Sequence, residues 1–192
     1  MSSRDFILNK IRQACVSEPT SPPTVPFFHT SSDRIVEKFQ KSLEMMGGDI
    51  LPKGEKDPYE FVKTKLASAK IICPVVPEIV GNCPLTEYTT PASLQNVDYG
   101  VIRASFGVAE TGSICLTDQN LLINTLGYLP QHLIILLDPT QIVENLHDAY
   151  ARPEWKQVHY AALHSGPSAT ADIEGVLIRG AQGVRSLSVF FD

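Results

Sequence analysis

A single carboxylate stands where an apolar segment ends, in the stretch GVAETGS at 107–113. Ligand sites in open α/β sheets lie in crevices outside the carboxyl ends of strands, and a glycine lets other groups approach the backbone closely. Glu110 is therefore a candidate catalytic nucleophile or base, or a ligand to a cation. Its neighbours are candidate ligand-binding residues: Thr111, Gly112 and Ser113. The alternative is a tight turn in which the carboxylate accepts hydrogen bonds from neighbouring backbone.

The second stretch, SGPSATADIEG at 165–175, runs from small and hydroxylated residues into two carboxylates. Placed before a helix predicted over about 170–179, its small residues favour an anion cradle at a positive helix end. They are candidate ligand-binding residues: Gly166, Ser168 and Thr170. Asp172 and Glu174 would lie in the first turn of that helix, where they complement the dipole and repel a phosphate. The stretch is therefore better explained as a helix start with one inward carboxylate, Asp172 being the catalytic candidate and Glu174 a ligand-binding one.

We expect these two stretches to share one site, because strand ends and helix starts gather along one edge of a three-layer sheet. The Glu110 side chain should lie within about 10 Å of some atom in 165–172, lining a concave surface. Two crowded carboxylates would raise the pKa of one of them and create an acid–base pair, whereas a cation between them would lower it.

One further histidine is a candidate, and several kinds of site are excluded. His132 precedes an apolar strand and could bind a ligand or transfer a proton, although a histidine there also caps local backbone. The four cysteines form no C-x-x-C pair, which argues against a zinc or iron–sulfur site on this chain. The sequence also lacks the G-x-S-x-G, G-x-x-x-x-G-K-[ST] and G-x-G-x-x-G motifs. We therefore expect no metal and no cofactor.

The segments that must position these residues alternate between helix and apolar strand, which is typical of an α/β sheet with helices on its faces. Helices are predicted over about 3–15, with Ser3 as its cap, and over about 33–46, 58–69, 139–150 and 170–179. Strands are predicted at 49–52, at 70–76, in two segments within 98–117, at 132–138 and at 186–191.

A proline-rich connector divides the chain. Four prolines between Pro19 and Pro26 exclude a helix there. Residues 1–30 are therefore expected to be an appendage, a helix plus connector, and residues 31–192 one domain. The apolar stripe of the first helix needs a surface to cover it, which a homo-oligomer would supply.

The composition of the chain indicates which partners and which cellular compartment to expect. Of the 192 residues, 43% are hydrophobic and 19% charged, as in ordinary globular proteins, and the net charge is -5. The basic residues form no block, so nucleic acid is not an expected partner. No apolar run is long enough to span a membrane, and the N-terminus lacks the uninterrupted apolar stretch of a signal peptide. A cytoplasmic protein is expected.

The two stretches together, GVAETGS at 107–113 and SGPSATADIEGVLIRGAQG at 165–183, resemble the LUD-domain family, in particular its lactate-utilisation protein C branch. The resemblance spans roughly residues 31–192 and includes the Gly-Gly after the second predicted helix and Leu-Pro-x-His before a strand. It implies the three-layer α/β/α sandwich shared by ribose-5-phosphate isomerase, glucosamine-6-phosphate deaminase and CoA transferases.

The resemblance also implies a function. It indicates a bacterial accessory protein or subunit that acts with iron–sulfur partner proteins to oxidise L-lactate to pyruvate and carries no redox cofactor itself. Two alternatives remain: an enzyme of the isomerase/CoA-transferase superfold that uses Glu110 on a small molecule, or a ligand-binding regulatory module. The expected ligand is a small carboxylate or a phosphorylated molecule. The chain departs from the family pattern, which has histidines and a proline in this region, at Gln182, Val184 and Ser188.

The dispersed cysteines generate a first prediction. We expect the purified chain to be colourless and to contain no iron–sulfur cluster, flavin or haem, because it has neither clustered thiolates nor a recognised cofactor loop. Absorption spectroscopy and metal analysis test this. A brown or yellow preparation with stoichiometric cofactor would overturn it.

Overall fold

The computed structural model describes residues 2–14, 21, 23–24, 26, 34–86, 89–171 and 174–192. The chain divides into two compact units, Met1–Ser31 and Ser32–Asp192. In the first unit, α1 (Ser3–Ala14) has no buried residue, and Phe6, Ile7 and Ile11 are each more than half exposed. The helix is capped by Ser2 and not by Ser3, because the Ser2 hydroxyl accepts from the Asp5 amide at 3.2 Å. The residues predicted to cap the second helix, Ser31 and Ser32, lie outside the described part of the chain.

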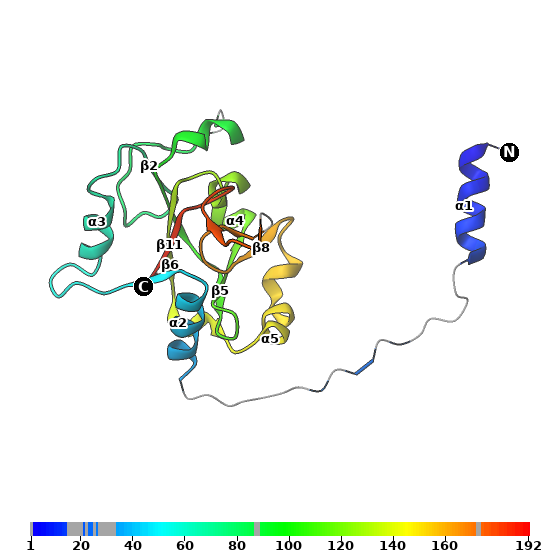
Figure 1. The fold of residues 1–192 in the computed structure, drawn as a ribbon, viewed down its shortest axis with the longest axis horizontal. Helices are drawn as coiled ribbons and strands as arrows, with labels where there is room; N and C mark the ends of the chain where they lie inside the picture. Colours follow the sequence, from blue (N-terminus) through cyan, green and yellow to red (C-terminus); the bar gives the residue numbers. More distant parts are fainter. Residues whose placement is uncertain are drawn as a thin grey trace. The chain divides into compact units, whose positions relative to one another are not determined.

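A five-stranded parallel sheet forms the centre of the second unit, in the order β1-β11-β6-β3-β2. Its strands are β1 (Asp49–Leu51), β2 (Ile72–Pro74), β3 (Tyr99–Arg103), β6 (His132–Leu137) and β11 (Ser186–Phe191). Figure 1 shows these strands together between helices. Because β6 is central, its residues Leu133–Leu137 are fully buried, as expected for a parallel strand covered on both faces.

Helices cover both faces of this sheet. On one face, α2 (Ile35–Met45) buries Phe39 and Leu43 in the larger apolar cluster, together with Leu133 and Ile135 of β6. On the other face, α3 (Glu60–Leu66) buries Val62 and Leu66 against Ile134 and Leu136. The expected three-layer α/β/α class is confirmed.

A second, four-stranded sheet carries the first of the two candidate stretches. Its order is β7-β4-β5-β8, with strands β4 (Phe106–Val108), β5 (Ser113–Thr117), β7 (Ile142–Val143) and β8 (Ala161–His164). The segment 98–117 thus holds three strands where two were predicted. One face of the small sheet packs in the larger cluster, and Phe106, Val108 and Cys115 pack with Ala149 of α5 (Leu146–Ala151) on the other.

Short elements complete this unit. They are α4 (Asp118–Leu121), the 3-10 turns η1 (Pro91–Asn96), η2 (Asn124–Gly127), η3 (Pro139–Gln141) and η4 (Pro153–Lys156), and the antiparallel pair β9 (Ala169–Thr170) and β10 (Ile178–Arg179).

Two predicted helices are wrong. The predicted helix over 170–179 is absent from the described residues there, because Thr170 pairs with Ile178 between β9 and β10 and Glu174 has a φ of 55°, outside the right-handed helical region. No helix runs from Pro139 to Tyr150 either. There, Ile142 and Val143 join the small sheet beside Gly107 and Val108, and α5 begins only after Asn145 caps it. β-branched residues gain more from a half-buried ladder than from a helix.

The absence of buried side chains in α1 generates a second prediction. Deleting residues 1–26 should leave a cooperatively folded protein whose melting temperature stays within about 2 °C of the full chain, because none of the described residues in this segment is buried. Thermal unfolding followed by circular dichroism, with size-exclusion chromatography for the oligomeric state, tests this. Loss of cooperative unfolding in the truncated chain would contradict it.

Candidate functional site

The two candidate stretches meet through a chain of hydroxyl groups. Strands β5 and β8 are antiparallel neighbours with Ile114 opposite His164, so the residues that flank this pair lie side by side. Ser113 Oγ lies 2.6 Å from Ser165 Oγ, and Thr111 Oγ1 lies 2.6 Å from Ser113 Oγ. The predicted meeting of the two stretches is thus made by hydroxyls at the end of the small sheet.

The C-terminal end of α2 explains why both stretches contain glycine. A Cβ atom at Gly112 would lie 2.3 Å from the backbone nitrogen of Leu43, and one at Gly166 would lie 2.7 Å from the Met46 carbonyl oxygen. Both glycines also have positive φ, of 63° and 95°. Only glycine fits this close approach without strain, so the small residues let both stretches pack against one helix end.

Glu110 makes the contacts of a turn residue. Its Oε2 accepts a hydrogen bond from the Leu146 amide at 3.1 Å, and its own amide donates to the Glu144 carbonyl at 3.0 Å. The exposed carboxylate thus lies at the N-terminus of α5, where a negative charge is favourable. These contacts match the alternative in which Glu110 accepts hydrogen bonds from neighbouring backbone.

The predicted helix start with one inward carboxylate is wrong, because no helix follows the small residues among those that the structure describes. Thr170 is in β9, and Glu174 is exposed in the turn between β9 and β10. Asp172, the second catalytic candidate, lies outside the described residues.

Residues of the second stretch instead line a cavity of about 310 Å³. Its walls come from three segments: Gly127–Tyr128, His164–Ala169 and Gln182–Val184. The Ser168 amide donates to the Val184 carbonyl at 2.9 Å, and the Gly180 amide donates to the Ser168 carbonyl at 2.8 Å. These bonds fasten the loop to the segment before β11. Gly166 and Ser168 thus line this cavity, whereas Glu110 is not among its lining residues.

His164 is the group in this cavity that sequence reasoning missed. Its Nε2 is buried and has no hydrogen-bond partner among the described residues, and its ring lies 5.1 Å from that of Tyr128. Burial lowers the pKa of His164, so the imidazole is neutral at pH 7. Its position as the last residue of β8, directly before the Ser-Gly-Pro-Ser run, was the available signal. A neutral imidazole there can donate or accept one hydrogen bond.

Tyr128, which lines the cavity beside His164, is paired with a second tyrosine. The hydroxyl groups of Tyr128 and Tyr160 are hydrogen-bonded to each other. Burial, together with this bond, raises the pKa of Tyr160, so its hydroxyl group stays protonated at neutral pH.

His132 does not belong to this cavity. It is the first residue of β6, and its Nδ1 lies 2.8 Å from the Ser186 hydroxyl at the start of β11. The structure therefore separates His132 from the other candidate residues.

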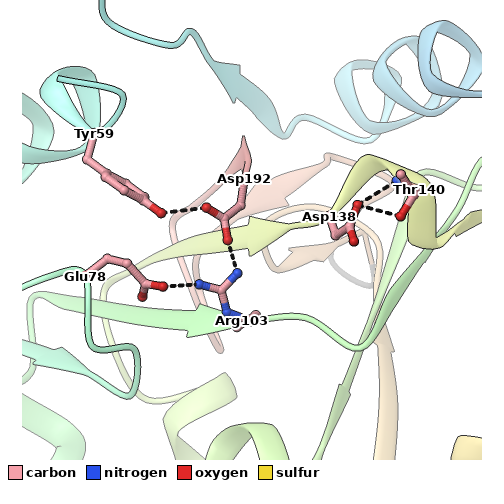
Figure 2. A network of polar contacts seen from close by, with 6 residues as sticks. All are labelled: Tyr59, Glu78, Arg103, Asp138, Thr140 and Asp192. Carbon is pink, nitrogen blue, oxygen red and sulfur yellow. Dashed lines mark hydrogen bonds and ion pairs between the residues drawn. The ribbon is translucent and has the colours of Figure 1, made fainter. Parts of the chain in front are cut away.

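The carboxyl edge of the central sheet, where open α/β sheets commonly bind ligands, is crossed by an ion-pair network. Arg103 Nη2 lies 2.5 Å from Glu78 Oε1, and Arg103 also pairs with Asp192. The Tyr59 hydroxyl donates to Asp192 at 2.5 Å. Figure 2 shows these residues reaching toward one another across the strand ends. The arginine is thus held between two carboxylates and is already paired on this edge.

Neither a metal-binding cluster nor a membrane-spanning helix is present among the described residues. No group of three or more His, Cys, Asp or Glu side chains in the described ranges could hold a metal ion. Within those ranges, no helix has the length and apolarity needed to cross a membrane.

Comparison with known proteins agrees with the geometry. The parallel sheet with helices on both faces defines a three-layer α/β domain. A family model described as the LUD domain matches residues 88–191, and the chain belongs to the LUD-domain family. An uncharacterized protein of Neisseria meningitidis serogroup B is 32% identical over 97 residues, which cover 49% of this chain and 42% of that relative. The chain therefore spans less than half the length of this curated relative.

A solved structure shares the fold. The crystal structure of a DUF162-family protein from Deinococcus radiodurans superposes with a TM-score of 0.56 and 18% identity, covering 82% of this chain and 95% of that one. At this identity, the likeness concerns the fold alone.

The lowered pKa of His164 generates a third prediction. Because the unfolded chain takes up a proton near the ordinary value of 6.5 and the folded chain does so only at lower pH, protonation favours unfolding. The free energy of unfolding should be highest above pH 6.5 and fall below it, by at most about 1.4 kcal/mol per pH unit for each such histidine. The pKa of His132 is also lowered by burial and contributes with the same sign.

Urea unfolding between about pH 7.5 and about pH 5 tests this. His164→Gln should flatten part of the slope, whereas His159→Gln, at an exposed histidine, is the matched control. An unchanged slope in His164→Gln would show that the imidazole is not responsible.

Proposed function

We propose that this chain is an accessory protein or subunit of the lactate-utilisation protein C branch, acting in a bacterial system that oxidises L-lactate to pyruvate. The LUD-domain family is associated with lactate utilisation. The observation that carries the proposal is the cavity beside β8, which is built from the loop 164–169 of the stretch that resembles this branch.

The size and lining of this cavity suit a small 2-hydroxy or 2-oxo acid. About 310 Å³ lies at the lower end of the range for small-molecule pockets. The polar side chains that line it, His164, Ser165, Ser168, Gln182 and Tyr128, are uncharged at neutral pH. Hydroxyl and amide groups would donate to the carboxylate and to the oxygen on the second carbon. The affinity should be modest, because no cation pairs with the carboxylate.

In this proposal, the electrons released by the reaction pass to partner proteins. Oxidation of L-lactate to pyruvate releases two electrons and two protons, and the dispersed cysteines of this chain suit no iron–sulfur cluster. Iron–sulfur proteins of the same system would therefore receive the electrons, and the assembly would lie in the cytoplasm. In this proposal the chain binds and orients the small acid beside those partners.

The alternative enzyme that uses Glu110 has less support. The Glu110 carboxylate accepts from the Leu146 amide and is not among the groups that line the cavity. A regulatory module would use the same cavity, and it differs from the proposal in needing no iron–sulfur partner.

The proposal generates a fourth prediction, tested by thermal shift. L-lactate or pyruvate should raise the melting temperature by binding in this uncharged cavity, whereas sugar phosphates and CoA esters should give no shift that depends on Ser168. At a hundredfold excess over the dissociation constant, the gain is about 2.7 kcal/mol. Ser168→Ala should reduce the shift, and Ser93→Ala, at an exposed serine in η1, is the control.

The partner part of the proposal has its own test. Iron–sulfur proteins encoded beside this chain should co-purify with it, and the shift with lactate should persist in the complex. A shift with sugar phosphates or CoA esters in place of lactate and pyruvate would contradict the ligand, and failure to co-purify would contradict the subunit role.

A further inference from the structure

The amino ends of three parallel strands bring a second set of polar side chains into one row. Tyr99, His132 and Ser186 are register neighbours on β3, β6 and β11, so they lie on the same face of the sheet, the face that α3 covers. The Tyr99 and His132 rings stack with their centroids 4.7 Å apart and an interplanar angle of 27°. On its other side, His132 Nδ1 lies 2.8 Å from Ser186 Oγ. The imidazole is therefore held from both sides, and Nε2 is the nitrogen left to contact a ligand.

A closed polar triad lies next to this row. Lys65 Nζ donates to Asp49 Oδ2 at 2.9 Å and to Ser188 Oγ at 2.7 Å, and Ser188 Oγ donates to Asp49 Oδ1 at 2.7 Å. Lys65 comes from α3 and Ser188 is fully buried. The three side chains of the triad satisfy one another's hydrogen bonds and fix α3 to the sheet beside the row. The triad therefore has a structural role and does not itself bind a ligand.

A cavity of about 320 Å³ opens at this amino edge. Its polar lining comes from four places in the chain and consists of Ser68, Lys70, Asp98, Tyr99, Gln131, His132 and Arg185. It shares no lining residue with the cavity of His164. The two sites are therefore distinct.

The charges at this cavity are unbalanced. Lys70 and Arg185 are exposed cations, and neither forms an ion pair with a carboxylate among the described residues. The one carboxylate of the lining, Asp98, accepts from the Lys70 amide at 2.7 Å and the Ile71 amide at 2.8 Å. Both bonds end on Asp98 Oδ2 and fix this carboxylate to the backbone, so the cavity lining carries two cations and one carboxylate.

We propose that this cavity is a second ligand site, which binds the oxyanion of a small molecule, either a phosphoryl or a carboxylate group. Arg185 and Lys70 supply the charge, His132 Nε2 donates a hydrogen bond, and Gln131 and Tyr99 complete the polar wall. A guanidinium presents paired donors that match the geometry of such oxyanions, and charge-assisted hydrogen bonds are the strong ones. The site is independent of the proposed role in lactate oxidation.

Binding at this site should depend on pH through His132. Burial lowers the pKa of His132, and the nearby charges of Arg185 and Lys65 lower it further, while Asp98 raises it. Tyr99 and Ser186, which face the ring from β3 and β11, are uncharged at neutral pH. A bound oxyanion adds a negative charge beside Nε2 and favours the imidazolium, so the affinity should rise as the pH falls from about 8 to about 6.

The test is an NMR titration of the full chain with sulfate and, separately, with acetate, at constant ionic strength. Neither anion changes its own charge in this pH range. Sulfate represents a phosphoryl group and acetate represents a carboxylate. Saturable shifts should appear at the amides of Tyr99, Gln131, His132 and Arg185. The anion that binds more tightly identifies the group that the site takes.

Matched variants separate this site from general attraction of anions. Arg185→Gln should weaken binding about tenfold or more, because a charge-assisted hydrogen bond is lost. Arg179→Gln, at an exposed arginine of β10, should leave binding unchanged. Lys70→Gln is a second variant at an exposed position, so the test does not depend on one substitution.

The pH dependence has its own variant. His132→Gln should retain the binding seen at about pH 8 and lose the gain at about pH 6. The proposal is overturned if Arg185→Gln and Lys70→Gln bind as the unaltered chain does. It is also overturned if Arg179→Gln weakens binding equally, or if the shifts map to the His164 cavity.

Discussion

Burial of β6 on both of its faces is the constraint on which the rest of the structure depends. Leu133 and Ile135 pack on the α2 side, Ile134 and Leu136 pack on the α3 side, and the strand is paired along both edges. A slip of one residue would exchange the two sets of side chains, so the register with β3 and β11 is firmly set. That register places His132 beside Tyr99 and Ser186 at one end, and Arg103 near Asp192 at the other. Both polar edges of the sheet are thus consequences of one apolar strand.

The sequence predicts the class of fold because its most continuous apolar segment is also the central strand of the sheet, β6. The run HLIILL has no polar interruption after its histidine, and a segment of this kind is stable only between two covering layers. The hairpin of β9 and β10 was missed for the opposite reason. Val176, Leu177 and Ile178 are apolar and suggest a packed helix, yet they are largely exposed, and the chain turns at Glu174. The apolar residues of a segment do not show by themselves whether another part of the fold covers them. Ile142 and Val143 were misassigned because their ladder partners lie in a distant part of the sequence.

The candidate site was predictable in its location and less so in its chemistry. The two stretches meet because β5 pairs with β8. Their glycines are needed because the backbone of α2 comes close, and the small residue types had already indicated a close approach of this kind. A carboxylate at a strand end, such as that of Glu110, suits the amide of a following helix as well as a ligand, and here it accepts from the Leu146 amide. The one sequence signal for His164 is its place directly before the Ser-Gly-Pro-Ser run, and it has no partner residue at a regular spacing. Its importance arises from burial of Nε2, which is a property of the assembled walls and not of any segment.

The pairing of β1 with β11 has a consequence for how the chain is made. Asp49 and Ser188 are joined although 139 residues separate them in sequence. Closing such a loop costs entropy that local contacts do not offset, so this edge of the sheet is expected to form late in folding. During synthesis β6 and β3 leave the ribosome well before β11, and until then one edge of β6 offers unpaired backbone groups. The nascent protein therefore passes through a stage with an open, apolar strand edge, which is the period when chaperones would engage it.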